Sequence, residues 1–234
     1  MSLLVVEFET ALRWTEILLG FAFAQQSLEH LTRFSIERLI FFPRLVLSLL
    51  LIFGWQTPWV LLALFVLALV MLKCFQGPYN GGADRMGLLI LCCCCLVQLA
   101  PTQAWKEIAI GYLSLQLTLS YFISGWVKVV NHEWRSGQAL CDVFQFSTYP
   151  VSENLRLLHL SPRLLFFASW FVMGLELLFP LALFSQIGLL IALTITAVFH
   201  FSNACFFGLN RFFWIWISAY PSLLWFQQRV FVEF

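Results

Sequence analysis

Long apolar runs alternate with short polar connections along almost the whole chain, and these runs define the predicted elements. A helix needs roughly 20 apolar residues to cross a bilayer. The sequence contains up to eight hydrophobic segments. They run from Ala11 to Ala24, Leu39 to Phe53, Trp59 to Cys74, Met86 to Leu99, Ile108 to Val130, Leu164 to Phe184, Ile187 to Phe207 and Phe212 to Phe226. The pattern predicts an all-α bundle with about eight transmembrane helices, or seven if the first segment, which Arg13 and Glu16 interrupt, lies in the interface.

Composition supports the same class of protein. The chain is 61% apolar and 11% charged, with a mean hydropathy of +0.87, whereas soluble domains are about 45–50% apolar and about 25% charged. We therefore predict an integral membrane protein with one transmembrane domain over residues 1–234, surrounded by the lipid bilayer. The net charge of +1 argues against a nucleic-acid partner. No small-residue cleavage site follows the N-terminus, so we expect the first helix to be retained.

The placement of lysine and arginine predicts the orientation of the chain. Ten of these residues lie in or beside loops one, three, five and seven, and three lie on the other side. By the positive-inside rule, both termini are then expected to be non-cytoplasmic. The longest connection, residues 131–163, is predicted to be cytoplasmic, with a short interfacial helix from Val151 to Leu160. The ten residues are Arg33, Arg38, Arg44, Lys73, Arg85, Lys128, Arg135, Arg156, Arg163 and Arg211.

Cysteine and histidine do not form an obvious metal or haem motif. Cys92 to Cys95 are consecutive, and consecutive helical side chains point about 100° apart. We therefore interpret them as packing residues and predict no metal site. Bis-histidine haem needs two histidines at matching depth, and only His200 lies well inside a predicted span. Haem or pigment binding is a less favoured alternative.

Two ionisable residues stand out because charged groups in a membrane are costly unless they are paired or functional. Lys128 lies near the end of the Ile108–Val130 segment, and Glu176 lies within FVMGLELLFP. Lys128 either extends to the lipid headgroups as an anchor or has a functional role. Glu176 is either a protonated carboxyl group bonded between helices or a group that handles protons or binds a ligand.

Two stretches carry a resemblance to a known family. YFISGWVKVVNHEW, from Tyr121 to Trp134, and FHFSNACFFGLNRFFWIWISAYP, from Phe199 to Pro221, together resemble the membrane core of vitamin K-dependent γ-carboxylases and of their bacterial relatives, the horizontally transferred transmembrane domain (HTTM) proteins. The resemblance extends roughly from Tyr121 to Trp225. YNGGADRM, from Tyr79 to Met86, looks like the polar loop of the bacterial branch, and this likeness implies a location in a bacterial inner (cytoplasmic) membrane.

The resemblance implies an intramembrane cavity for a quinone, a hydroquinone or another apolar small molecule. In the carboxylase, the lysine of the first stretch is the base that deprotonates vitamin K hydroquinone, and Lys128 falls on that position. We expect this cavity to be lined by Lys128, Glu176, His200 and Asn203. The predicted catalytic residues are Lys128, Glu176 and His200, and the predicted cofactor-binding residues are Asn203, Tyr121 and His132.

Two departures from the carboxylase limit what is carried over. The carboxylase continues into a lumenal region that engages its substrate, whereas this chain ends at Phe234, so we do not expect protein carboxylation. The loop before Met86 lacks the carboxylase's histidine motif. Whether the protein is an enzyme is left open. The alternatives are a non-catalytic accessory subunit among other membrane subunits and, with less support because no inverted repeats are visible, a transporter.

Overall fold

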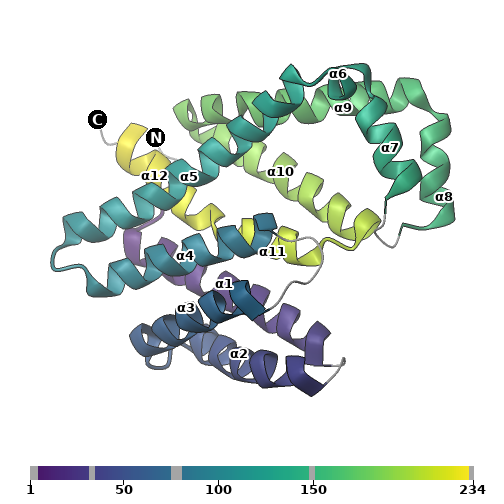
Figure 1. Ribbon diagram of the computed structural model, residues 1–234. Helices are drawn as coiled ribbons and strands as arrows, with labels where there is room; N and C mark the ends of the chain where they lie inside the picture. Colours follow the sequence, from purple (N-terminus) through teal and green to yellow (C-terminus); the bar gives the residue numbers. More distant parts are fainter. Residues whose placement is uncertain (1–4, 32–34, 75–80, 148–150, 232–234) are drawn as a thin grey trace. The chain divides into compact units, whose positions relative to one another are not determined.

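The computed structural model describes residues 5–31, 35–74, 81–147 and 151–231, and every regular element within these ranges is a helix (Figure 1). Arg33, Tyr79 and Asn80 lie outside the described residues, so the structure does not test the predictions that concern them. The all-α prediction is confirmed for the described part of the chain.

Four helical stretches within the described residues are long and apolar enough to cross a bilayer. The first lies in α4 (Gly81–Leu99), and the second is α5 (Gln103–Val130). The third combines α9 (Pro162–Leu178) with the 3-10 helix η2 (Phe179–Phe184), and the fourth is α10 (Gln186–Phe207). These helices identify an integral membrane protein, but the count of about eight spans is not confirmed.

The remaining predicted segments are too short or too polar to meet the same criteria. The apolar part of α3 (Thr57–Cys74) is short, and α1 (Phe8–Leu31) and α2 (Ser35–Phe53) carry charged residues along their lengths. The last predicted segment is divided between α11 (Asn210–Ser218) and α12 (Tyr220–Phe231). Apolar runs of about 15 residues are shorter than the roughly 20 residues that a span needs, so the crossings expected over these segments stay a prediction.

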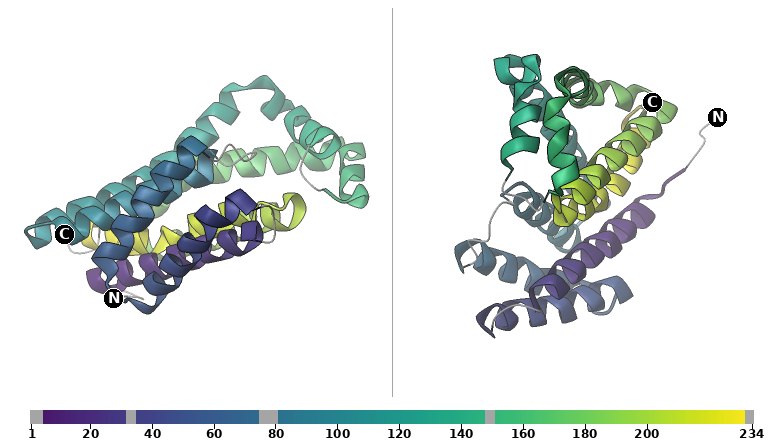
Figure 2. Two further views of the ribbon diagram at one scale, coloured as in Figure 1. Left: turned by 60° about the horizontal axis from the view of Figure 1, so that its bottom comes forward. Right: turned by 90° about the vertical axis from the view of Figure 1, so that its right-hand side faces the viewer.

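The chain forms two compact units, and α5 contributes to both. The first unit contains residues 1–115 and 211–234. Within it, α1 packs along α2, α2 along α3 and α3 along α4, while α12 returns to α1 (Figures 1 and 2). Phe8 and Trp225 meet edge to face, with ring centroids 5.2 Å apart, where α1 and α12 pack.

Arg13 explains how the first predicted segment accommodates its charges. Its guanidinium group pairs with Glu16 at 3.2 Å and donates hydrogen bonds to the carbonyl oxygens of Leu51 and Ile52. Those carbonyls belong to the last turn of α2, where they lack partners within the helix. Arg13 therefore neutralises a buried carboxylate and caps a neighbouring helix.

We expect Arg13→Gln to lower the free energy of unfolding by about 2 kcal/mol, because charge-assisted hydrogen bonds to buried groups are lost. The measurement is unfolding of the detergent-solubilised protein by sodium dodecyl sulfate. Arg229→Gln is the matched control, since Arg229 forms an exposed ion pair with Glu107 in the same unit and such pairs contribute about 0–1 kcal/mol. Equal effects of the two substitutions would contradict the capping role.

The second unit contains residues 116–210. Beyond α5, the chain folds into α6 (His132–Ser136), α7 (Gln138–Phe146), α8 (Glu153–Arg156) and the 3-10 helix η1 (Leu157–Leu160), then into α9, η2 and α10. Helices α6 and α7 both pack against α9 (Figure 2). The helix expected at Val151–Leu160 is thus formed by α8 and η1, and its position at the membrane interface stays a prediction.

Within the second unit, the connection over residues 131–163 packs against α9 and α10 through a small hydrophobic core. Cys141, Phe144, Val151, Leu165 and Phe207 form a buried cluster, with leucines from α7, α8 and η1 against it. Gly137, at φ +81°, turns the chain between α6 and α7, and a Cβ atom there would lie 2.8 Å from the Cα atom of Phe166. The cluster and this turn fix the end of α5 relative to α9.

Candidate functional site

One face of α5 carries the side chains that form the candidate site. Tyr121, Gly125 and Lys128 are spaced so that they lie along the same face of a helix. Ser124 lies one turn before Lys128, and its hydroxyl oxygen accepts a hydrogen bond from Lys128 Nζ at 2.7 Å. The face therefore presents a hydroxyphenyl group, a gap and an ammonium group in succession.

Lys128 and Glu176 form an ion pair between α5 and α9. Lys128 Nζ donates to Glu176 Oε2, and the side chains are 16% and 6% exposed. The ammonium group also lies 5.2 Å from the ring centroid of Trp134, an arrangement that further favours its positive charge. Lys128 is thus turned toward a carboxylate, and Glu176 has the intramembrane donor that its position requires.

Gly125 allows α5 and α9 to approach closely enough for this pair to form. A Cβ atom at Gly125 would lie 2.6 Å from the backbone nitrogen of Leu177 and 3.1 Å from the carbonyl carbon of Glu176. Both neighbours are backbone atoms and cannot rotate away. A residue with a side chain at this position would therefore separate the helix that carries Lys128 from the helix that carries Glu176.

Tyr121 and His200 form a second polar pair, between α5 and α10. The Tyr121 hydroxyl oxygen and His200 Nε2 share a hydrogen bond of 2.8 Å, whose donor depends on the histidine tautomer. Both side chains are buried. The Tyr121 ring also stacks on Phe179, with ring centroids 4.3 Å apart. Tyr121 therefore links α5 both to η2 and to α10.

The other two predicted site residues occupy different surroundings. His132 is the first residue of α6, and its side chain is exposed. Asn203 is half-buried, and its backbone carbonyl accepts a hydrogen bond from Gly208 where α10 ends. No hydrogen bond or ion pair among the described residues joins either side chain to the two polar pairs. Their role in cofactor binding stays a prediction.

Sequence reasoning did not identify Ser124, Gly125 or Phe179 as residues that shape the site. Ser124 could have been found from its position one turn before Lys128, because residues four apart on a helix are neighbours. Phe179 gave no comparable signal, since one phenylalanine among 26 in the chain is not distinguished by type or spacing.

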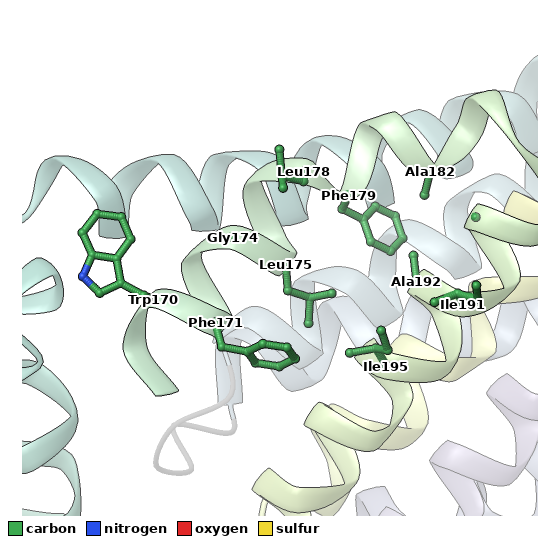
Figure 3. Close-up of a pocket in the computed structure, with 11 residues that line it drawn as sticks. Trp170, Phe171, Gly174, Leu175, Leu178, Phe179, Ala182, Ile191, Ala192 and Ile195 are labelled. Atoms are coloured by element: carbon green, nitrogen blue, oxygen red, sulfur yellow. The ribbon is translucent and has the colours of Figure 1, made fainter. Parts of the chain in front are cut away.

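An apolar groove runs between α9, η2 and α10 in the same unit. This open groove has a volume of about 370 Å³, and Figure 3 shows the side chains of Phe171, Leu175 and Phe179 opposite those of Ile191 and Ile195. Phe179 lies between this groove and Tyr121, because it lines the groove and stacks on the tyrosine ring. The residues that line the groove do not include Lys128, Glu176, His200 or Asn203. The cavity expected around those four residues therefore stays a prediction.

The cysteine run lies in α4, where Cys93 and Cys94 are buried and Cys92 and Cys95 are partly buried. Across the described ranges, no group of three or more His, Cys, Asp or Glu side chains could hold a metal ion.

The chain was compared with protein families, curated proteins and solved structures. A family model described as the HTTM domain matches residues 96–228, which is more than half of the chain. Neither the curated proteins nor the solved structures gave a significant match. The matched region includes all of α5, α9 and α10, and with them the Lys128–Glu176 and Tyr121–His200 pairs. The HTTM domain is a membrane domain related to the core of vitamin K-dependent carboxylases, and this chain belongs to the HTTM domain family.

Proposed function

We propose that the second unit binds a quinol, or another apolar molecule with an acidic hydroxyl group, and that the Lys128–Glu176 pair accepts the proton of that hydroxyl. The observation that carries the proposal is the pairing of these two side chains between two membrane-spanning helices. Ionisable residues at such positions are rare and mark proton or ligand sites. Membership of a family related to the carboxylase membrane core supports the same chemistry.

The pair can take up a proton without leaving an unpaired charge inside the membrane. Transfer of a proton from the Lys128 ammonium group to the Glu176 carboxylate gives a neutral amine beside a neutral carboxylic acid. The amine nitrogen can then accept the hydroxyl proton, which leaves the ligand as an anion beside the Lys128 ammonium group. Glu176 stays protonated, so the site gains one proton and the bound molecule loses one. Of the two side chains, Lys128 is the more exposed, at 16%, so it is the one that a ligand can reach.

The residues of this unit suit both the apolar ring or tail and the hydroxyl group of such a ligand. The groove offers aliphatic and aromatic side chains to an apolar ring or tail. The Tyr121–His200 pair provides a hydroxyl group and an imidazole within the same unit, and the Phe179 ring connects them to the groove.

The test uses menadiol and the purified protein in nanodiscs under anaerobic conditions. Quenching of tryptophan fluorescence measures binding, and ultraviolet absorption measures ionisation of the bound hydroxyl group as a function of pH. We expect the wild-type protein to bind menadiol saturably and to shift its ionisation to lower pH. We expect Lys128→Met to retain binding but to lose this shift.

Lys73→Met is the matched control, because Lys73 is exposed at the end of α3 and its substitution removes the same charge. It should leave both binding and ionisation unchanged. Absence of saturable binding by the wild-type protein, or the same ionisation shift in Lys128→Met, would rule out the proposed chemistry.

A further inference from the structure

The first unit contains a separate group of buried polar residues contributed by four helices. Gln26 from α1, Arg44 from α2 and Arg211 from α11 are 2%, 5% and 9% exposed, and Asp84 from α4 is partly buried. Arg211 Nη2 donates to Asp84 Oδ1, and Arg44 Nη1 donates to Gln26 Oε1 at 2.6 Å. We call these four residues the Arg44–Arg211 cluster.

The cluster contains one more positive charge than negative charge. Arg211 is paired with Asp84, whereas the hydrogen-bond acceptor for Arg44 is the neutral amide of Gln26. The guanidinium group of Arg44 also lies over the ring of Phe23, 4.1 Å from its centroid, but an aromatic face carries no net charge. The two pairs lie in the same part of the unit. A Cβ atom at Gly87, one turn after Asp84 in α4, would lie 3.3 Å both from the Phe23 ring, over which Arg44 lies, and from the side chain of Ile215, one turn after Arg211 in α11. Among the described residues of the cluster, one carboxylate therefore faces two guanidinium groups.

The same cluster holds hydrogen-bond donors that remain available. Arg211 Nε and Gln26 Nε2 are buried, and neither has a hydrogen-bond partner among the described residues. Buried donors of this kind are normally satisfied, because their desolvation is otherwise uncompensated. Two available donors beside an excess positive charge match the oxygen atoms of an anion, and guanidinium groups bind phosphate oxygens especially well.

The position of the cluster places it near one end of its helices. Gln26 lies toward the C-terminal end of α1, whereas Asp84 and Arg211 lie in the first turns of α4 and α11. Helix N-termini carry partial positive charge, which adds to the attraction for an anion. Arg44, Arg85 and Arg211 also belong to the side of the membrane that the lysine and arginine distribution predicts to be cytoplasmic.

We propose that the Arg44–Arg211 cluster binds a phosphate group, with Arg44 and Arg211 Nε donating to its oxygens and Gln26 Nε2 assisting. The phosphate belongs to the headgroup of an anionic phospholipid or to a free phosphate ion. Both sources present negatively charged, non-bridging phosphate oxygens to the guanidinium groups, and the experiment separates them.

The first arm places the protein in phosphatidylcholine nanodiscs with increasing phosphatidylglycerol and records the thermal midpoint by tryptophan fluorescence. The second arm uses lipid-depleted protein in neutral detergent and adds sodium phosphate against sodium chloride at equal ionic strength. A bound ligand raises the midpoint as its concentration rises. A saturable rise in the first arm alone identifies a lipid headgroup, and a rise in the second arm identifies free phosphate as sufficient.

Three variants make the result specific. Arg44→Gln should weaken the anion dependence roughly tenfold, as expected for the loss of charge-assisted hydrogen bonds. Arg85→Gln removes the same charge from an exposed residue next to Asp84 and should leave the dependence unchanged. Asp84→Asn removes the carboxylate that competes for Arg211 and should strengthen anion binding, which keeps the test decisive if Arg44→Gln does not fold.

The proposal fails if the wild-type protein shows no anion-dependent rise in the thermal midpoint, if Arg85→Gln matches Arg44→Gln, or if Asp84→Asn weakens anion binding.

Discussion

Replacing Gly125 with alanine is expected to lower the free energy of unfolding by about 3–5 kcal/mol, because it adds overpacking to the loss of a buried ion pair. The added Cβ atom would lie 2.6 Å from the backbone nitrogen of Leu177, so α5 and α9 must separate. Lys128 and Glu176 would then be drawn apart, although neither residue has been changed. Unfolding by sodium dodecyl sulfate from dodecyl maltoside micelles measures this loss.

Gly174→Ala provides the matched control for this substitution. Gly174 lies on α9, and a Cβ atom there would meet no heavy atom within 4 Å. Alanine in place of a helical glycine stabilises the helix by up to about 1 kcal/mol, so the control should be neutral or slightly more stable. A Gly125→Ala protein as stable as this control would show that α5 and α9 do not depend on the close approach at Gly125.

The long spans could be predicted from sequence because their signals are local. The segment expected at Ile187–Phe207 corresponds to α10, which ends where Gly208 takes up φ +68°. Similarly, the Ile108–Val130 segment ends with α5 at Val130. A run of apolar residues followed by a helix-ending residue contains all of this information.

The partners of the charged residues inside the apolar segments could not be predicted in the same way, because those partners lie far away in the chain. Arg13 looked like an interruption of a span, yet it caps the end of α2. Arg44 likewise lies within an apolar run and is buried against Gln26 and Phe23. Hydropathy assigns each residue a fixed value, whereas the cost of burying an arginine depends on its partners.

The candidate site was predictable as a set of residues but not as a set of pairs. Lys128, Glu176, Tyr121 and His200 were identified by their charge or polarity inside apolar segments and by the family resemblance. Helical periodicity places Tyr121 and Lys128 on one face of α5, but it does not say which helices pack against that face. The structure adds that Lys128 meets α9 while Tyr121 meets α10. It also adds Gly125, whose missing side chain makes the first of these contacts possible.

Lys128→Met is expected to lower the free energy of unfolding by about 3–5 kcal/mol at neutral pH, because it leaves the Glu176 carboxylate buried without its cation. Glu176→Leu should be milder, because the Lys128 ammonium group keeps Ser124 and the Trp134 ring as partners. The measurement is unfolding by sodium dodecyl sulfate.

The double variant Lys128→Met/Glu176→Leu separates structural pairing from proton chemistry. Replacing both members of a buried ion pair with apolar residues of similar size is often neutral or stabilising, so the double variant should be more stable than Lys128→Met alone. Additive losses from the two single substitutions would show that the side chains are not energetically coupled. A stable double variant can then be tested with menadiol: retained ionisation of the bound hydroxyl would assign the pair to folding alone, whereas its loss in a folded protein would assign the proton transfer to Lys128 and Glu176.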